Sequence, residues 1–362
     1  MMTICAQRTV SNMLEQLSSQ SLSRKPQIVT IGGGTGHFAL LTGLKEHPVD
    51  IVAIVSMADD GGSSGVLRDE LGVLPPGDVR QCLAALSRET PTLRALFSYR
   101  FAGGPMKGHA FGNLFISALE KITGSFATAV AEAGRILSVH GEVIPVTEGN
   151  MRLIIELKDG THVSGEKFLD GDEHVRTVGV KKVVLQNPVE AHPRAVEKIM
   201  NADMVVLGPG DLFGSVLPPL LIPAIARAVK ETKASVVYVS NLTNKRGQTD
   251  GFTSHHYAHV IHEYLESHRI DTLICNITPP PPHLAERYQE QEGPDMIVSC
   301  EENSTSSHPY KVIARDLVSF ESPIFHPQDT LNKGRSLIRH DPIKLAAAVL
   351  EPIVASTMSV QV

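Results

Sequence analysis

Glycine, hydroxyl and carboxyl side chains gather in two short segments near the start of the chain, "GGGTG" at 32–36 and "DDGGSSG" at 59–65. Glycines let a backbone approach phosphate oxygens closely, and a helix N-terminus that follows them offers unpaired N–H groups. The candidate phosphate-binding residues are therefore Gly32, Gly33, Gly34, Thr35 and Gly36. The spacing differs from G-x-G-x-x-G because His37 takes the third glycine position, and the Lys-Ser/Thr pair of a P-loop is missing.

The second segment admits three chemistries. NAD enzymes carry an acidic residue for the ribose after their second strand, and Asp59 stands at that place. The adjacent carboxylates of Asp59 and Asp60 are also candidate ligands for Mg²⁺ held against phosphates, or acceptors for sugar hydroxyls. The same segment can equally be a capped polar turn. The other candidate ligand-binding residues here are Gly61, Gly62, Ser63 and Ser64, with Arg80 to balance negative charge.

Two histidine patterns are candidates for ligand or metal binding. His109 and Asn113 are four apart, which places them on one face if a helix already includes His109. An imidazole and an amide suit recognition of a sugar, phosphate or base, although a satisfied helix cap is the plain alternative. One predicted helix carries His255, His256, His259 and His262. The spacing of His255 and His259 can chelate zinc, but HExxH is missing and a solvated helix face is favoured.

The elements that must position these residues form an alternating pattern. "QIVTI" at 27–31 and "IVAIV" at 51–55 are short apolar runs that suit buried parallel strands, and "FALLTGLKEH" between them has helical spacing. Strand-like runs return at 202–210, 234–241 and 271–276. We predict an α/β fold, a Rossmann-like, doubly wound and mostly parallel sheet. The loops after four of its strands should meet at the carboxyl edge, where ligands bind.

The rest of the chain is divided as follows. Residues 1–25 are predicted to be a flexible tail, and 26–355 a single domain with a small β-rich insertion at about 142–186, where Asp159–Gly160 supplies a hairpin turn. Helices are expected at 78–87 with Asp78 as cap, 111–123, 126–137 and 341–354. The prolines at 279–282 predict an extended loop, and "YKVIARDLV" an edge strand.

Composition excludes several classes of partner. The net charge of −6 leaves no basic field for nucleic acid. No uninterrupted apolar run reaches the roughly 20 residues of a membrane-spanning helix, so we expect no membrane insertion and a cytoplasmic protein. The four cysteines (Cys5, Cys82, Cys275 and Cys300) form no CxxC pattern and are expected to be reduced and packed.

Six motifs together resemble one known family. "IGGGTGHFALLTGLK", "ADDGGSSGVLRDELGVLPPGDVRQCLAAL", "GHAFGNLFISAL", "ADMVVLGPGDLFGSVLPPLLIPAI", "SNLTNKRGQTDGF" and "RHDPIKLA" occur in the order found in the gluconeogenesis factor (YvcK-like) family, distant relatives of 2-phospho-L-lactate transferase (CofD). The resemblance covers about residues 27–350. It implies a Rossmann-like core with a β insertion, binding of UDP-sugars such as UDP-N-acetylglucosamine and UDP-glucose, a homodimer, and a cytoplasmic role in cell-wall synthesis and cell shape under gluconeogenic growth.

The resemblance also extends the set of candidate ligand-binding residues. The further positions that fall on family motifs are Gly208, Gly210, Asn241, Asp250 and Arg339. We assign the loop glycines and Arg339 to a diphosphate, and Asp59 or Asp60 to ribose, sugar or metal. Asp211 would be unfavourable beside a diphosphate unless a metal ion or an arginine intervenes.

Three functions remain in competition. A regulatory protein that binds a UDP-sugar leads, and the resemblance carries no settled catalytic activity. A Mg²⁺-dependent phospholactate-type transferase that uses a nucleotide is the alternative, favoured by Asp59 and Asp60. The hypothesis of an NAD-dependent oxidoreductase has less support. His37 stands at the third glycine position of G-x-G-x-x-G, and NAD binding needs only one of the carboxylates of Asp59 and Asp60.

Overall fold

The computed structural model describes residues 24–300, 308–321 and 337–359. The predicted tail, 1–25, lies outside this range except for Arg24 and Lys25. Arg24 forms an ion pair with Asp203 at 2.7 Å, which joins the start of the described chain to the sheet.

Seven parallel strands form the main sheet, in the order β10-β9-β8-β7-β1-β2-β3. Their bounds are β1 Gln27–Gly32, β2 Asp50–Val55, β3 Glu142–Pro145, β7 Met204–Leu207, β8 Ser235–Val239, β9 Thr272–Asn276 and β10 Lys311–Arg315. The chain moves outward from β1 to β3, returns to the other side of β1, and moves outward again from β7 to β10. The predicted doubly wound, Rossmann-like α/β fold is confirmed, with its switch point between β1 and β7.

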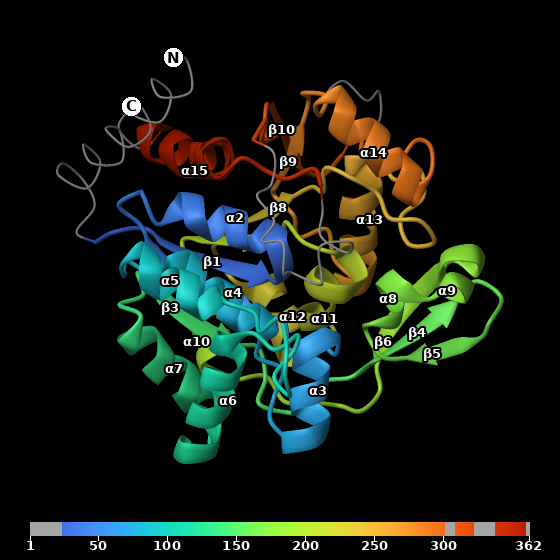
Figure 1. The fold of residues 1–362 in the computed structure, drawn as a ribbon. Helices are drawn as coiled ribbons and strands as arrows, with labels where there is room; N and C mark the ends of the chain where they lie inside the picture. Colours follow the sequence, from blue (N-terminus) through green and yellow to red (C-terminus); the bar gives the residue numbers. More distant parts are fainter. Residues whose placement is uncertain (1–23, 301–307, 322–336, 360–362) are drawn as a thin grey trace.

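The central strands are apolar because both of their faces are covered. Four residues of β7 and the last five of β1 and of β2 are buried, as expected for continuous apolar runs. The helix α2 (Gly34–Leu44) packs with α15 (Pro342–Ser359), and α10 (Pro193–Met200) with α12 (Pro223–Glu231). Figure 1 shows these two pairs on opposite sides of the strands.

The remaining helices lie around the main sheet, except α8 and α9, which belong to the insertion. They are α3 Gly62–Leu71, α4 Gly77–Leu86, α5 Pro91–Ser98, α6 Phe111–Thr123, α7 Phe126–Ile136, α8 Phe168–Gly171, α9 Glu173–Val178, α11 Leu217–Leu220, α13 Ser254–Leu265 and α14 Pro282–Glu292, with a π-helical turn η1 at Leu212–Val216. Among the described residues no single helix meets the length and hydropathy needed to cross a membrane, although the bent pair Leu212–Leu220 and Pro223–Glu231 does so by length and composition alone.

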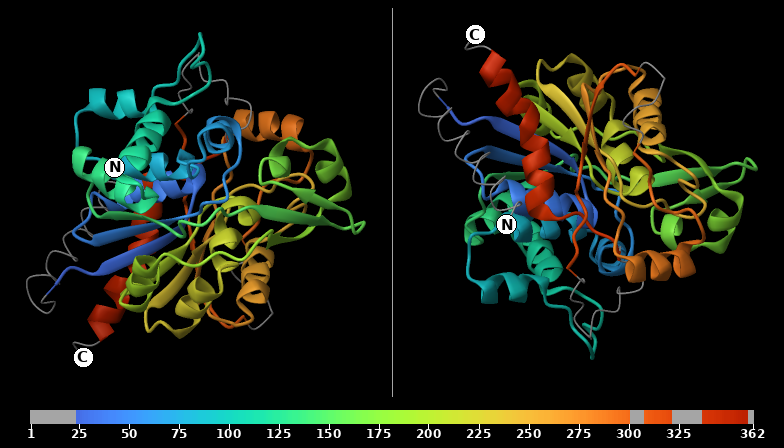
Figure 2. Two further views of the ribbon diagram at one scale, coloured as in Figure 1. Left: turned by 90° about the horizontal axis from the view of Figure 1, so that it is seen from below. Right: turned by 90° about the horizontal axis from the view of Figure 1, so that it is seen from above.

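A small antiparallel sheet forms the insertion, in the order β5-β4-β6. Its strands are β4 Leu153–Leu157, β5 His162–Ser164 and β6 Val180–Leu185, and the hairpin turn at Asp159–Gly160 is present. Figure 2 shows the insertion projecting from one side of the main sheet. The predicted boundary at 142 is wrong, because β3 pairs in parallel with β2 and completes the main sheet.

Two cysteines differ from expectation. Cys275 at the end of β9 and Cys300 form a disulfide, with Cα atoms 5.7 Å apart. A bridge between Thr243 and Ile297 joins the segment before Cys300 to the loop after β8, a contact that spacing along the chain does not reveal. Cys82 is a buried free thiol as expected, and Cys5 lies outside the described residues.

Candidate functional site

A cavity of about 1060 Å³ opens at the carboxyl edge of the sheet, at the switch point between β1 and β7. The loops after β1, β2, β7 and β8 all contribute to its walls, as the sequence predicts. Helices α4, α6 and α14 and the insertion complete the lining. The volume is at the upper end of the roughly 300–1,000 Å³ typical of small-molecule sites.

The sequence-predicted residues divide into two groups. Those that the structure brings together around the cavity are Gly34, Thr35, Gly36, Asp59, Gly61, Gly62, Ser63, Ser64, Arg80, Asn113, Gly210, Asn241 and Arg339. Those that lie outside its lining are Gly32, Gly33, Asp60, His109, Gly208 and Asp250. The carboxylate of Asp250 instead accepts a hydrogen bond from the Gly247 N–H at 2.8 Å and stabilises its own loop.

Close packing of the loops explains some of their glycines. A Cβ on Gly36 would lie 2.8 Å from the Pro209 carbonyl oxygen, so the first loop contacts the third directly. The side-chain amide of Asn241 donates to the Gly210 carbonyl at 2.9 Å, which fixes the third loop against the fourth. The converging loops therefore form one interlocked floor, in addition to any role with a ligand.

Asp59 and Asp78 place two carboxylates at this floor. Asp59 accepts from the Gly61 N–H at 3.0 Å, and Asp78 accepts from the Gly34 N–H at the start of α2. Burial raises the pKa of Asp59, and burial with the charge of Asp59 raises the pKa of Asp78 to about 7. The predicted capping of α4 by Asp78 is wrong: no side chain caps that helix, and Asp78 contacts α2 instead.

Asp60 faces the other way from its neighbour. Its carboxylate lies 3.6 Å from the Arg68 guanidinium and accepts from the Lys167 N–H at 2.6 Å. Lys167 belongs to the insertion, so Asp60 fastens the insertion to the segment after β2. Of the two adjacent carboxylates, only Asp59 reaches the cavity.

A chain of hydrogen bonds joins α4, α6 and the start of α3. Arg80 donates to the Asn113 side-chain oxygen at 2.9 Å, and the Asn113 amide donates to Ser63 at 3.1 Å. The Ser63 hydroxyl in turn lies 3.0 Å from His109 Nδ1. His109 thus supports the site through Ser63 and does not line it, because the helix begins only at Phe111.

Several lining residues were not among the predicted ligand-binding residues. They are Asp78, Arg100, Glu166, Asp170, Arg176, Asp211, Lys245, Arg287 and Tyr288. Burial, together with the charges of Asp59, Asp170 and Asp211, raises the pKa of Glu166 well above its ordinary value. Lys245 pairs with Asp211 at 2.7 Å, so a lysine balances this carboxylate where a metal ion or an arginine was expected. The two adjacent cations of the "NKRGQTD" loop, Lys245 and Arg246, are the signal in the sequence that could have indicated such a role.

Metal-binding arrangements are limited. Within the described parts of the chain, no group of three or more His, Cys, Asp and Glu side chains is arranged to hold a metal ion. The expected solvated face of α13 is wrong for His255 and His262, which are buried among Tyr310, His308 and His268. A two-carboxylate site at Asp59 and Asp78 remains, in which Ser64 hydrogen-bonds Asp59.

Comparison with known proteins agrees with this architecture. The model of the family described as 2-phospho-L-lactate transferase CofD matches residues 28–318. A relative from Thermotoga maritima is 39% identical over 325 residues, which are 89% of this chain and 98% of that protein. The Gluconeogenesis factor of Bacillus subtilis is 36% identical over 332 residues, 91% of this chain and 99% of that protein.

A solved structure extends the likeness to three dimensions. The crystal structure of a UPF0052 family member from Bacillus halodurans matches with a TM-score of 0.81 at 35% identity, covering 91% of this chain and 100% of that one. The similarity therefore spans the sheet, the insertion and the cavity. The chain belongs to the CofD family, among relatives that are named gluconeogenesis factors.

Proposed function

We propose that this protein binds a UDP-sugar, such as UDP-N-acetylglucosamine or UDP-glucose, and acts as a regulatory gluconeogenesis factor in the cytoplasm. The observation that carries the proposal is the cavity at the switch point, where four glycine-rich loops converge. Nucleotides bind in doubly wound folds at this place. The cavity offers both cationic and hydroxyl-accepting side chains, which a diphosphate joined to a sugar requires.

Each part of such a ligand has a complementary group in the lining. The first-turn N–H groups of α2 have no intrahelical acceptors, and of these the Gly34 N–H donates to Asp78. In the proposal the diphosphate lies there, with Arg339 nearby for charge. Asp59 and the Arg80–Asn113 pair accept and donate hydrogen bonds to hydroxyl or amide groups of the ribose and sugar.

The pair of carboxylates favours a second candidate, the Mg²⁺-dependent transferase. Two half-buried acids whose pKa values are both raised fit a divalent cation, and Mg²⁺ is commonly held by one or two carboxylates plus phosphates. Asp59 and Asp78 would hold it, with the Ser64 hydroxyl beside them. When bound, Mg²⁺ supplies the positive charge that allows both acids and a phosphate to ionise together.

Calorimetric titration separates the two candidates. We expect UDP-N-acetylglucosamine and UDP-glucose to bind, and GTP to bind more weakly, with and without Mg²⁺. If neither UDP-sugar binds at about 1 mM, where only about 4 kcal/mol of binding energy is needed, the proposed function fails. Tight GTP binding that requires Mg²⁺ would support the transferase instead.

An Asp59→Ala variant connects the binding to this cavity. It should weaken UDP-sugar binding much more than it lowers the melting temperature, because Asp59 faces the cavity. Asp69→Ala is the matched control, since Asp69 is exposed on α3 and pairs with Arg152 outside the cavity. A large loss of stability with unchanged affinity would assign Asp59 to the turn alone.

A further inference from the structure

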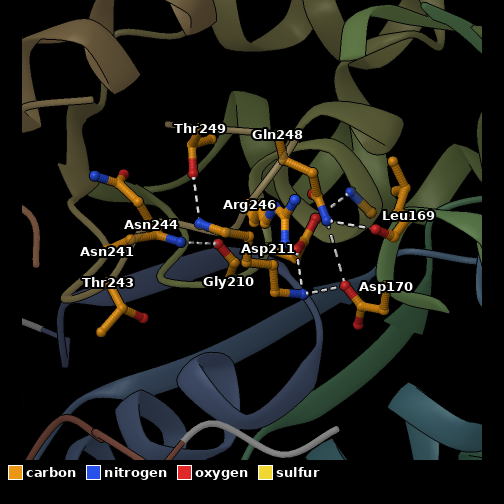
Figure 3. A network of polar contacts seen from close by, with 12 residues as sticks. Leu169, Asp170, Gly210, Asp211, Asn241, Thr243, Asn244, Arg246, Gln248 and Thr249 are labelled. Atoms are coloured by element: carbon orange, nitrogen blue, oxygen red, sulfur yellow. Dashed lines mark hydrogen bonds and ion pairs between the residues drawn. The ribbon is translucent and has the colours of Figure 1, made fainter. Parts of the chain in front are cut away.

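One ammonium group joins three separate segments at the wall of the cavity. Lys245, after β8, lies 2.5 Å from an Asp170 oxygen and 2.7 Å from an Asp211 oxygen. Asp170 belongs to α8 of the insertion, and Asp211 follows the Gly208–Gly210 loop after β7. Figure 3 shows Asp170 and Asp211 converging, with Gln248 beside them.

Both carboxylates are otherwise held in place. The second Asp211 oxygen accepts from the Gly214 N–H at 2.6 Å, at the start of η1. Asp170 accepts from the Gln248 amide at 3.3 Å, and that amide also donates to the Leu169 carbonyl at 2.8 Å. Asp211 is therefore held at the wall independently of the ammonium, and Asp170 keeps one further contact there.

The charge of Lys245 is secure in this position. Burial opposes it, but the charges of Asp170 and Asp211 raise the pKa of Lys245 well above its ordinary value. All three residues line the same cavity as the first-turn N–H groups of α2, and a Cβ on Gly210 would lie 3.0 Å from the Gly33 carbonyl. Asp211 thus follows a loop that touches the start of α2, where the diphosphate is proposed to bind.

We propose that Lys245 is a positioning residue that determines whether the cavity accepts an anionic ligand: it neutralises Asp211 and holds Asp170 of the insertion against the same wall. The inference rests on the proposed function, because it concerns the diphosphate end of that ligand. Without the ammonium, the two carboxylates would present two unbalanced negative charges to a diphosphate in the same cavity, and like charges repel. With it, the wall carries one negative charge instead of two.

A double-mutant cycle tests this role. Affinities for UDP-N-acetylglucosamine and for UDP are measured by calorimetry in wild type, Lys245→Met, Asp211→Asn and the double variant. Lys245→Met should weaken binding of both ligands by about tenfold or more, and UDP more than the UDP-sugar because UDP carries more charge. The double variant should regain most of that loss. Lys181→Met, an exposed lysine of the insertion paired with Glu156, is the control and should bind as wild type does.

The outcomes separate this inference from the proposed function. If wild type binds neither ligand, both the proposed function and this inference are refuted. If wild type binds but Lys245→Met binds equally well, or the double variant stays as weak as Lys245→Met, only the inference is overturned. Should Lys245→Met fail to fold, Asp211→Asn decides the question: it must bind UDP at least as tightly as wild type, and weaker binding refutes the role of Lys245.

Discussion

At the scale of single residues, His37 couples the first loop to the core. Its ring is fully buried, with Nε2 2.7 Å from the Thr30 hydroxyl, and burial lowers its pKa to about 4. The unfolded chain takes up a proton near the ordinary value of 6.5, whereas the folded protein does not do so until about 4. His37 therefore has no effect on stability above about pH 6.5, and it lowers stability as the pH falls from there toward 4.

This shift predicts a measurable pH dependence. Between about pH 7.5 and about pH 5, His37 should cost about 2 kcal/mol of the free energy of unfolding. In His37→Gln the loss of stability over that interval, measured by urea unfolding, should be smaller by this amount. His259→Gln is the control because His259 is exposed on α13, and it should keep the wild-type dependence. An unchanged dependence in His37→Gln would show that His37 is protonated in the folded protein.

Asp78 should reduce the stability of the protein in the absence of a divalent cation. Its carboxyl lines the cavity, and burial together with the charge of Asp59 raises the cost of ionising it. Asp78→Asn keeps an acceptor for the Gly34 N–H but removes the repulsion. We expect it to stabilise the protein by about 1–2 kcal/mol in chelator, as a higher melting temperature, and to lose any effect of Mg²⁺ on binding. Asp50→Asn, an exposed acid at the start of β2, should leave both quantities unchanged; a lower melting temperature in Asp78→Asn would contradict the argument.

The sequence identified Asp59 but misassigned Asp78, for a physical reason. Asp59 follows a recognisable buried strand, so the fold rule for carboxyl edges places it at the cavity. Asp78 stands at the start of a helix, where a capping role satisfies every local rule. Only the packing of α4 against the first loop, a contact between distant segments, reveals that its carboxylate serves α2.

At the scale of elements, the crossing of α2 and α15 depends on Gly43. A Cβ at this position would lie 1.9 Å from the Pro342 carbonyl oxygen and 2.8 Å from the Ala346 Cβ. Alanine normally stabilises a helix by about 1 kcal/mol relative to glycine. Here the clash with the α15 backbone should reverse the sign, so Gly43→Ala should lower the free energy of unfolding by about 2 kcal/mol.

The matched substitution is Gly134→Ala in α7. The nearest atom to its Cβ would be a Leu83 methyl at 3.6 Å, an ordinary contact. This variant should gain up to about 1 kcal/mol from helix propensity alone. Denaturant unfolding of the two variants should therefore give opposite signs, and a stabilised Gly43→Ala would mean that α15 can move away without cost.

Helices and strands with a clear local sequence pattern could be predicted. Elements whose type or sheet depends on contacts with distant segments could not. The apolar runs of β1, β2 and β7 predict strands, and the spacing of apolar residues in α6 predicts a helix. The residues of β3 look like part of the insertion because β-branched strands read alike in either sheet. The start of α14 is hidden by its prolines, although proline is tolerated in the first turn of a helix, as at Pro282.

At the scale of the whole molecule, strand order and the position of the insertion determine where the cavity lies and which residues line it. Alternating strands and helices predict a doubly wound sheet, and the carboxyl edge follows from that. Which face of the insertion meets this edge depends on side-chain contacts between segments far apart, such as Lys167 with Asp60. The spacing of the acidic and basic residues of the insertion therefore did not predict that they line the cavity.

The docking of the insertion provides the last prediction. The Tyr264 hydroxyl on α13 accepts from the Val183 N–H at 2.8 Å and lies 3.2 Å from the Val183 carbonyl, in the middle of β6. A second contact, from the Val180 N–H to the Gly247 carbonyl at 2.6 Å, joins β6 to the loop that carries Lys245. Tyr264→Phe removes the first contact and leaves the second.

Amide exchange should then rise in the insertion and not in the main sheet. Leaving the Val183 groups without partners costs about 1–3 kcal/mol, which should speed exchange of β4, β5 and β6 by about tenfold or more. The central strands β1 and β7 should exchange as in wild type, because their pairing does not involve the insertion. Tyr99→Phe, an exposed tyrosine outside the insertion, is the control. If exchange instead rose equally in both sheets, the insertion and the core would unfold as one cooperative unit, and the wall formed by Asp170 and Lys245 would open only with the whole protein.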